Sequence, residues 1–135
     1  MNKLEEIIAV KRAEVERLRP IAASLVDQAF AITDYRGFRA ALSRPDDQLA
    51  IIAEIKRASP SAGVIAENVD PAERARDYQQ QGAEAISVLT DQNFFQGSVS
   101  DLMAVHVPVR SPTPVHRRGL PVKCSVAVPV VHLWD

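Results

Sequence analysis

Apolar residues near the start of the chain recur at the spacing of an amphipathic helix. They lie three, four and seven positions apart, which places them on one face of a helix. The members of this set are Leu4, Ile7, Ile8, Val15 and Leu18. Pro20 stops a helix or forces a break in it. The pattern therefore predicts a helix over residues 2–19.

The segment that follows carries weaker signals. Residues 21–33 are mostly small and apolar and show no clear period. Thr33 or Asp34 is a candidate N-cap for a short helix over 35–43. The residues that this helix would turn inward are Phe38, Ala41 and Leu42. Residues 44–47, Arg-Pro-Asp-Asp, indicate a turn before the next element.

A strand, a helix and a second strand are predicted between residues 49 and 90. The strands cover about 49–56 and 85–90, and a loop over 57–69 precedes the helix. The helix signals are Asp70 as N-cap, Pro71 and Glu73 in the first turn, an end near Gln81, and Gly82 as C-cap. Ala75 and Tyr78 are placed to face the sheet. This order predicts a parallel pair of strands joined by a right-handed crossover.

The composition changes near residue 105. A loop is predicted over 91–98 and a short helix over 99–105, in which Val99, Leu102 and Met103 are apolar. Residues 1–105 contain 16 acidic and 12 basic residues. Residues 106–135 have one acid, four bases, all three histidines, the one cysteine and five of the nine prolines. Prolines at this density remove ladder donors, so no coherent pattern is predicted there. We therefore expect a helical extension at 1–48, two βα units at 49–105, and an atypical basic tail at 106–135.

Length and charge limit the classes of protein that the chain can represent. Its 135 residues suit one domain, and a net charge of −1 gives no reason to expect a nucleic-acid or membrane partner. The chain has no apolar run of the roughly 20 residues that span a bilayer, and its N-terminus does not resemble a signal peptide. A single cysteine, Cys124, excludes an internal disulfide and fits a reducing compartment. We expect a cytoplasmic protein.

The strongest candidate chemistry lies at the end of the first predicted strand. Glu54 and Lys56 are two positions apart, so their side chains face the same side of a strand. Burying a charge without a partner is costly, so an acid and an amine at a strand end are usually paired or functional. Ser59-Pro60-Ser61 follows directly. This arrangement favours catalysis or substrate binding, and the alternative is a surface ion pair on an edge strand.

A second group of polar and aromatic residues follows the second predicted strand. Ligands of α/β sheets bind at the carboxyl ends of the strands, where both groups would meet. This second group comprises Thr90, Asp91, Asn93, Phe94, Phe95, Gln96, Gly97 and Ser98. On extended backbone Phe94 and Phe95 would point to opposite sides, so one of them could belong to the core, and Gly97 could be only a turn residue. Together the groups predict a site for a small anion with an apolar or aromatic part.

Other residues give little reason to expect further sites. The histidines lie 10 and 16 residues apart with no carboxylate among them, so we expect no metal site. Cys124 stands in no motif and is expected to be inert, and Arg117-Arg118 is expected to be solvated. No glycine-rich nucleotide fingerprint is present.

Several segments resemble the indole-3-glycerol phosphate synthase family, in the family's order. They are LEEIIAVKRAEVERLR, FRAALSRP, IIAEIKRASPSAGVI, DPAERARDYQQQGAEAISVLTD and FFQGSVSDLMAV, which together span residues 1 to about 105. The resemblance implies an α/β fold, the N-terminal part of a (β/α)₈ TIM barrel with an extra helical segment, of which two strands are recognisable. It also implies a carboxy-lyase of tryptophan biosynthesis that needs no cofactor.

The resemblance also implies a substrate and roles for particular residues. The family converts 1-(2-carboxyphenylamino)-1-deoxyribulose 5-phosphate to indole-3-glycerol phosphate, releasing carbon dioxide and water. Lys56 would contact the anionic groups of this aromatic sugar phosphate and take part in proton transfer, and Glu54 would orient and charge-balance it. The substrate-binding residues would be Ser59, Pro60 and Ser61, with Phe95 packing on the anthranilate ring.

The tail departs from the family pattern. The third family strand ends in a motif like PVLRKDF, whose lysine is the general acid, and this chain has Arg118 at that place in PVHRRGL. A guanidinium is a poor proton donor near neutrality. We expect a truncated or frameshifted form with little activity alone, whose open sheet edge pairs with a complementary barrel half or another copy. The alternatives are another phosphate-binding barrel enzyme and a non-catalytic interaction fragment.

Overall fold

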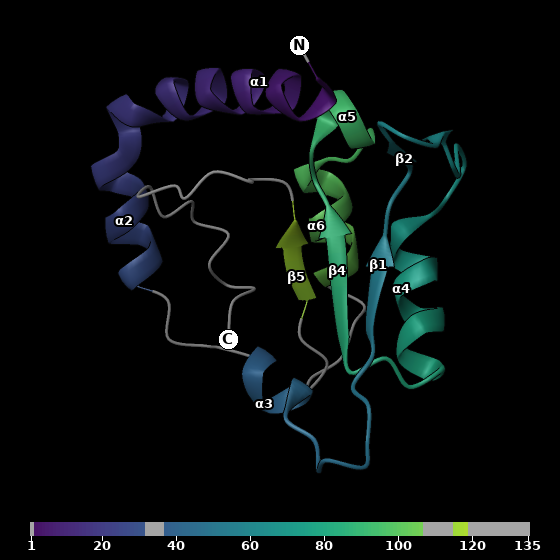
Figure 1. The fold of residues 1–135 in the computed structure, drawn as a ribbon. Helices are drawn as coiled ribbons and strands as arrows, with labels where there is room; N and C mark the ends of the chain where they lie inside the picture. Colours follow the sequence, from purple (N-terminus) through teal and green to yellow (C-terminus); the bar gives the residue numbers. More distant parts are fainter. Residues whose placement is uncertain (1, 32–36, 107–114, 119–135) are drawn as a thin grey trace. The chain divides into compact units, whose positions relative to one another are not determined.

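The chain divides into two compact units. The computed structural model describes residues 2–31, 37–106 and 115–118. For residues 116–118 it describes the backbone only. Residues 2–31 belong to the first unit, and the remaining described residues belong to the second. Figure 1 shows the elements of both.

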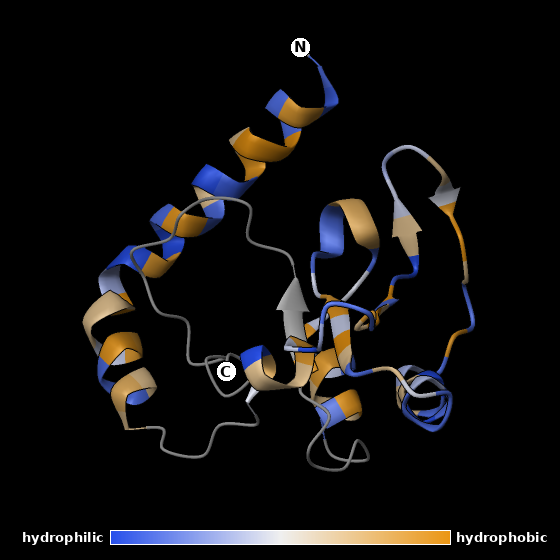
Figure 2. Ribbon diagram, turned by 60° about the horizontal axis from the view of Figure 1, so that its bottom comes forward, coloured by the Kyte–Doolittle hydropathy of each residue, from blue (hydrophilic) through white to orange (hydrophobic). Residues whose placement is uncertain are grey.

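The first unit contains the predicted N-terminal helix. Helix α1 covers Lys3–Leu18, and Asn2 and Glu5 form a capping box at its start. The Asn2 side chain accepts from the Glu5 N–H at 2.9 Å, and the Glu5 carboxylate accepts from the Asn2 N–H at 2.8 Å. Figure 2 shows hydrophilic and hydrophobic residues alternating along this helix, as its period requires. The prediction of a helix over 2–19 is confirmed.

Pro20 changes the direction of the chain without ending helical structure. It lies in a short 3₁₀ turn, η1 (Arg19–Ile21), and helix α2 (Ala22–Phe30) follows at once. The sequence did not predict α2, because its small residues give no strong period. Its buried residues, Leu25 and Ala29, are four positions apart and therefore share one face.

The second unit is built on a parallel sheet. Strand β1 (Ile52–Ile55) pairs in parallel with β4 (Ala85–Leu89), which confirms the predicted strand–helix–strand unit. Strand β5 (Val115–Arg118) pairs in parallel with the other edge of β4, giving the order β1-β4-β5. The prediction that two strands are recognisable and that no pattern continues beyond 105 was therefore wrong. Proline on both sides of a short, basic strand hid its signal.

Two helices cover one face of this sheet. Helix α4 (Pro71–Gln80) packs against β1 and β4, and helix α6 (Val99–His106) packs against β4, β5 and α4 (Figure 1). The predicted cap is confirmed, because the Asp70 carboxylate accepts from the N–H groups of Ala72 and Glu73. Gly82 has a φ of 90° just after the helix, which is the left-handed conformation expected there.

The core lies between the sheet and these helices. Its fully buried members are Ala75, Ile86, Val88, Leu102, Val105 and Val115. Because side chains alternate along a strand, Ile86 and Val88 face the helices, whereas Ser87 faces the opposite side. Ser87 pairs in register with Glu54, so Glu54 also faces away from the helices. The sheet therefore separates an apolar core from the side that carries the candidate chemistry.

The segment before β1 is anchored at the amino end of the sheet. Helix α3 (Phe38–Leu42) starts after Gly37, so it begins later than predicted, and Thr33 and Asp34 lie outside the described residues. The predicted turn is confirmed by a bond from the Gln48 N–H to the carbonyl of Pro45 at 2.9 Å. The Glu84 carboxylate then accepts from the Ile51 N–H at 2.7 Å and pairs with Arg44 at 3.3 Å.

The predicted loop after β1 contains regular structure. Strands β2 (Ala58–Ser59) and β3 (Gly63–Val64) form a short antiparallel hairpin within residues 57–69. A two-residue strand is too short to leave a period in the sequence, so this prediction was wrong.

No helix in the described part of the chain has the length and apolar character needed to cross a membrane.

Candidate active site

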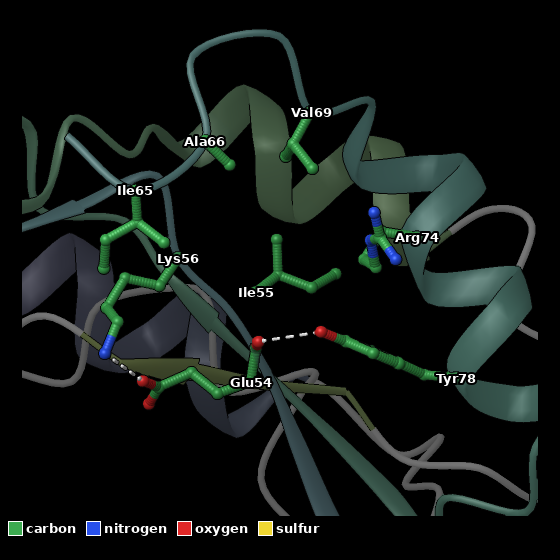
Figure 3. Close-up of a pocket in the computed structure, with 8 residues that line it drawn as sticks. All are labelled: Glu54, Ile55, Lys56, Ile65, Ala66, Val69, Arg74 and Tyr78. Carbon is green, nitrogen blue, oxygen red and sulfur yellow. Dashed lines mark hydrogen bonds and ion pairs between the residues drawn. The ribbon is translucent and has the colours of Figure 1, made fainter.

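Glu54 and Lys56 form an ion pair at the carboxyl end of β1. The Lys56 amine lies 3.3 Å from a Glu54 carboxylate oxygen, and about a third of each side chain is exposed. Figure 3 shows the amine turned toward the carboxylate. The prediction that these side chains share one side of the strand is confirmed. Because β1 is an edge strand of the described sheet, the Glu54–Lys56 contact fits both a functional site and a surface ion pair.

A pocket of about 270 Å³ lies beside this pair. Its lining residues are Glu54, Ile55, Lys56, Ile65, Ala66, Val69, Arg74 and Tyr78. Figure 3 shows that Tyr78 directs its hydroxyl toward the main-chain carbonyl of Glu54, and this contact measures 3.5 Å. The Arg74 guanidinium lies 6.0 Å from the centre of the Tyr78 ring. The pocket therefore combines apolar walls, an aromatic ring and charged groups of both signs.

The predicted binding residues Ser59, Pro60 and Ser61 do not line this pocket. They form the turn of the β2–β3 hairpin, where the Ser59 hydroxyl accepts from the Ala62 N–H at 3.1 Å. The hydroxyls of Ser59 and Ser61 are 3.4 Å apart. Ser61 is exposed and the other two are half-buried. These contacts order the turn and leave Ser61 accessible to a ligand.

Phe94 and Phe95 lie in a single helical turn, α5 (Gln92–Phe95). The Asp91 carboxylate caps this turn by accepting from the Phe94 N–H at 2.7 Å. The assumption of an extended backbone was therefore wrong, and both rings are half-buried. Helix α5 packs against β2, so the helical turn that carries Phe95 lies next to the strand that carries Ser59.

Gly97 is required for a close approach of two backbone segments. A Cβ atom added to it would collide with the main-chain carbonyl of Leu89 at the end of β4. The Gly97 N–H also donates to the carbonyl of Asp91 at 2.9 Å. Gly97 is thus more than a turn residue, because only glycine lets the chain return over the strand end.

Sequence reasoning missed a pair that links the two groups of candidate residues. The Arg57 guanidinium lies 2.9 Å from a carboxylate oxygen of Asp101, 44 positions later. This hydrogen bond raises the pKa of Arg57 above its usual value. The spacing of Ser98 and Asp101 is a capping signal that could have placed Asp101 at a helix start. Nothing in the sequence indicated its contact with Arg57.

The remaining predictions concern Arg118, Cys124 and metal binding. Arg118 is the last residue of β5 and stands in register with Leu89. Cys124 lies outside the described residues. Within the ranges that the structure covers, no three His, Cys, Asp or Glu side chains gather as a metal-binding group.

Enzymes with parallel α/β sheets bind small ligands at the carboxyl ends of their strands, and the Glu54–Lys56 pair lies at such an end. The family model for indole-3-glycerol phosphate synthase matches residues 4–118. The chain belongs to the indole-3-glycerol phosphate synthase family, a family of TIM-barrel lyases of tryptophan biosynthesis. The match extends past residue 105, where the sequence resemblance ended, and includes β5.

Individual relatives agree with this assignment. The chain is similar to proteins named indole-3-glycerol phosphate synthase from Chlorobium luteolum (45% identity over 115 residues) and Geobacillus kaustophilus (47% over 109 residues). A third, from Exiguobacterium sibiricum, is 48% identical over 112 residues. These alignments cover 81–83% of this chain and 40–44% of the relatives. The chain thus spans about two fifths of the length of these relatives.

Proposed function

We propose that this chain carries one wall of an indole-3-glycerol phosphate synthase active site. The observation that supports the proposal most strongly is the Glu54–Lys56 pair at the end of β1. It lies inside the family match and on the side of the sheet away from the core helices. The ligand is 1-(2-carboxyphenylamino)-1-deoxyribulose 5-phosphate, an anionic aromatic sugar phosphate.

Lys56 is the group that meets the substrate in this proposal. Its ammonium donates hydrogen bonds to the anionic groups of the substrate and takes part in proton transfer. Protonation of the ribulose-derived carbonyl lets the aryl carbon attack. Loss of carbon dioxide and then of water completes the indole ring. Glu54 holds the amine in place through its 3.3 Å contact and balances its charge.

The neighbouring elements provide the remaining contacts. Ser59 and Ser61 offer hydroxyl groups from the hairpin turn, and Pro60 shapes the backbone between them. Phe95 offers a face to the anthranilate ring. Support for this arrangement comes from the packing of α5 on β2, which brings the two segments together.

The described strands also suggest what completes the site. In the part of the chain that the structure describes, one edge of β1 and one edge of β5 have no strand beside them. An exposed strand edge is a template for pairing. We propose that a complementary barrel half, or a second copy of the chain, pairs there.

The fluorescence of indole-3-glycerol phosphate provides the test of catalysis. Purified chain is incubated with substrate, and Lys56→Ala is compared with Lys3→Ala, which removes an exposed lysine from the first unit. Product from the parent and from Lys3→Ala, but not from Lys56→Ala, supports the proposal. Equal product from all three contradicts the role of Lys56. The assay is repeated with a complementary barrel half, because the described strands supply only one wall of the site.

Ribulose 5-phosphate, a sugar phosphate without the anthranilate group, tests the alternative of a different phosphate-binding enzyme. The proposal predicts weaker binding of this compound, since it offers no ring to Phe95. Equal affinity for both compounds would favour the alternative. Salt-sensitive association with a protein partner and no product would favour a non-catalytic interaction role.

A further inference from the structure

The candidate residues lie on two loops that are far apart in sequence. The first loop, residues 57–69, follows β1 and carries Ser59, Pro60 and Ser61. The second loop, residues 90–98, follows β4 and carries Phe95. A ligand that touches both loops needs a fixed distance between them, because misplacement of binding groups costs affinity and rate.

Arg57 organises the first loop from its base. Its main-chain carbonyl accepts from the N–H groups of Ile65 at 2.8 Å and Ala66 at 3.0 Å. Its side chain reaches the carbonyl of Glu67 at 3.4 Å. One residue therefore ties the two ends of the hairpin segment together, directly after Lys56.

Asp101 organises the end of the second loop. Its carboxylate accepts from the Ser98 N–H at 2.9 Å, and its own N–H donates to the Ser98 hydroxyl at 3.0 Å. These reciprocal bonds form a cap at the start of α6. The loop that begins at the end of β4 is thus fixed at its far end by Asp101.

The side chains of Arg57 and Asp101 join these two organised segments. One guanidinium nitrogen lies 2.9 Å from Oδ1, and Nε lies 3.5 Å from Oδ2. Both side chains are largely buried, with 22% and 16% of their surface exposed. A paired, two-point contact of this kind is stronger and more directional than an exposed ion pair.

We propose that Arg57 is a positioning residue which, through Asp101, sets the distance between the loop that carries Ser59 and Ser61 and the loop that carries Phe95. The importance of this distance for substrate binding rests on the proposed function. The mechanical coupling of the loops does not. Weakening the pair from either side releases both loops, whereas weakening the α6 cap alone does not.

Amide hydrogen exchange in the full chain tests the coupling without a ligand. Asp101→Asn keeps an acceptor for the Ser98 N–H but loses the charge that holds Arg57, and Arg57→Lys keeps the positive charge but loses the two-point contact. Both variants should speed exchange at Ile65 and Ala66 about tenfold, the change that a loss of about 1.4 kcal/mol produces. Ser98→Ala, which removes only the hydroxyl of the cap, should leave exchange there within about twofold.

Unchanged exchange at Ile65 and Ala66 in Asp101→Asn would overturn the proposal, as would an equal increase in Ser98→Ala. Protection of Ile86 and Val88 in β4 shows that a variant is folded. If Arg57→Lys does not fold, Asp101→Asn decides the question alone.

Titration with the carboxyphenylamino-deoxyribulose phosphate substrate provides the second measurement. Asp101→Asn should bind it several-fold more weakly than Ser98→Ala does. Equal affinity of these two variants contradicts the positioning role. If the parent chain does not bind the substrate, the proposed function fails, and hydrogen exchange still decides whether Arg57 couples the loops.

Discussion

Mutation of the two charged residues of the candidate pair should change substrate binding to different degrees. Lys56→Ala removes a cation from the site, whereas Glu54→Gln removes a competing anion and keeps the shape of the side chain. A charge-assisted hydrogen bond contributes about 1.5–3 kcal/mol. We therefore expect Lys56→Ala to weaken binding of the sugar phosphate at least about tenfold.

Glu54→Gln provides the contrast, because its effect on binding should be at most about twofold even though it lowers turnover. Calorimetric titration of both variants measures the difference. Equal losses of affinity would mean that the two residues act only as a structural pair.

Gly97 shows how one residue can control the path of a loop. Gly97→Ala places a methyl group against the carbonyl of Leu89, so the loop or the strand must shift. Overpacking of this kind costs about 1–3 kcal/mol. We expect a lower midpoint in urea for Gly97→Ala.

Gly63→Ala is the matched control. No atom lies within 4 Å of its added methyl, and its cost arises from a φ of 66° at the exposed start of β3. Gly97→Ala should therefore weaken substrate binding more than Gly63→Ala does. Equal effects on binding would contradict the importance of the Leu89 contact.

At the scale of elements, the cap of α4 should contribute measurably to stability. The Asp70 carboxylate accepts from two N–H groups of the first turn, and this helix covers β1. Loss of an N-cap costs about 0.5–2 kcal/mol. Asp70→Ala should lower the free energy of unfolding by about this amount in chemical denaturation.

The control is Asp77→Ala, an exposed residue of the same helix that takes no part in the cap. Its effect should lie within about 0.5 kcal/mol of the parent chain. Matching losses in Asp70→Ala and Asp77→Ala would argue against a stabilising cap.

The sequence predicted elements that carry local signals. Helix α1 has a clear period, and α4 has Asp70 at its start and Gly82 after its end. The elements that it missed depend on contacts with distant residues. Strand β5 has one apolar residue, Val115, and gains its structure by pairing with β4. The hairpin of β2 and β3 is held through the carbonyl of Arg57, which no local pattern reveals.

The same division applies to the candidate site. The alternation of side chains was enough to predict that Glu54 and Lys56 share one side of β1. The contact of Arg57 with Asp101 spans 44 positions, and Tyr78 reaches Glu54 from a helix 24 positions later. Packing of α4 and α6 against the sheet creates these contacts, so they could not be read from sequence spacing.

At the scale of the second unit, Glu84 links stability to pH. Its hydrogen bond from the Ile51 N–H, with help from Arg44, holds the pKa of the Glu84 carboxyl below its ordinary value. A lowered pKa in the folded state stabilises the fold above the unfolded pKa, and this contribution is lost as pH falls through the folded pKa. Part of the acid unfolding of the chain, below about pH 4.5, should therefore depend on Glu84.

Glu84→Gln tests this dependence, because it keeps an acceptor for Ile51 and removes the titrating group. Unfolding midpoints measured from pH 3 to pH 7 should fall less steeply in Glu84→Gln than in the parent chain. Parallel pH profiles would show that Glu84 contributes no linkage. Asp46→Asn, at the exposed turn before β1, is a suitable control.

Mapping of the substrate on the chain by NMR tests directly whether the segments that follow β1 and β4 bind one ligand. Amide shifts are followed while the carboxyphenylamino-deoxyribulose phosphate is added to the parent chain and to Lys56→Ala. We predict saturable shifts in residues 54–63 and 91–98 of the parent chain, and their loss in Lys56→Ala. Absence of shifts in both segments, or identical titrations of the two proteins, would contradict this prediction.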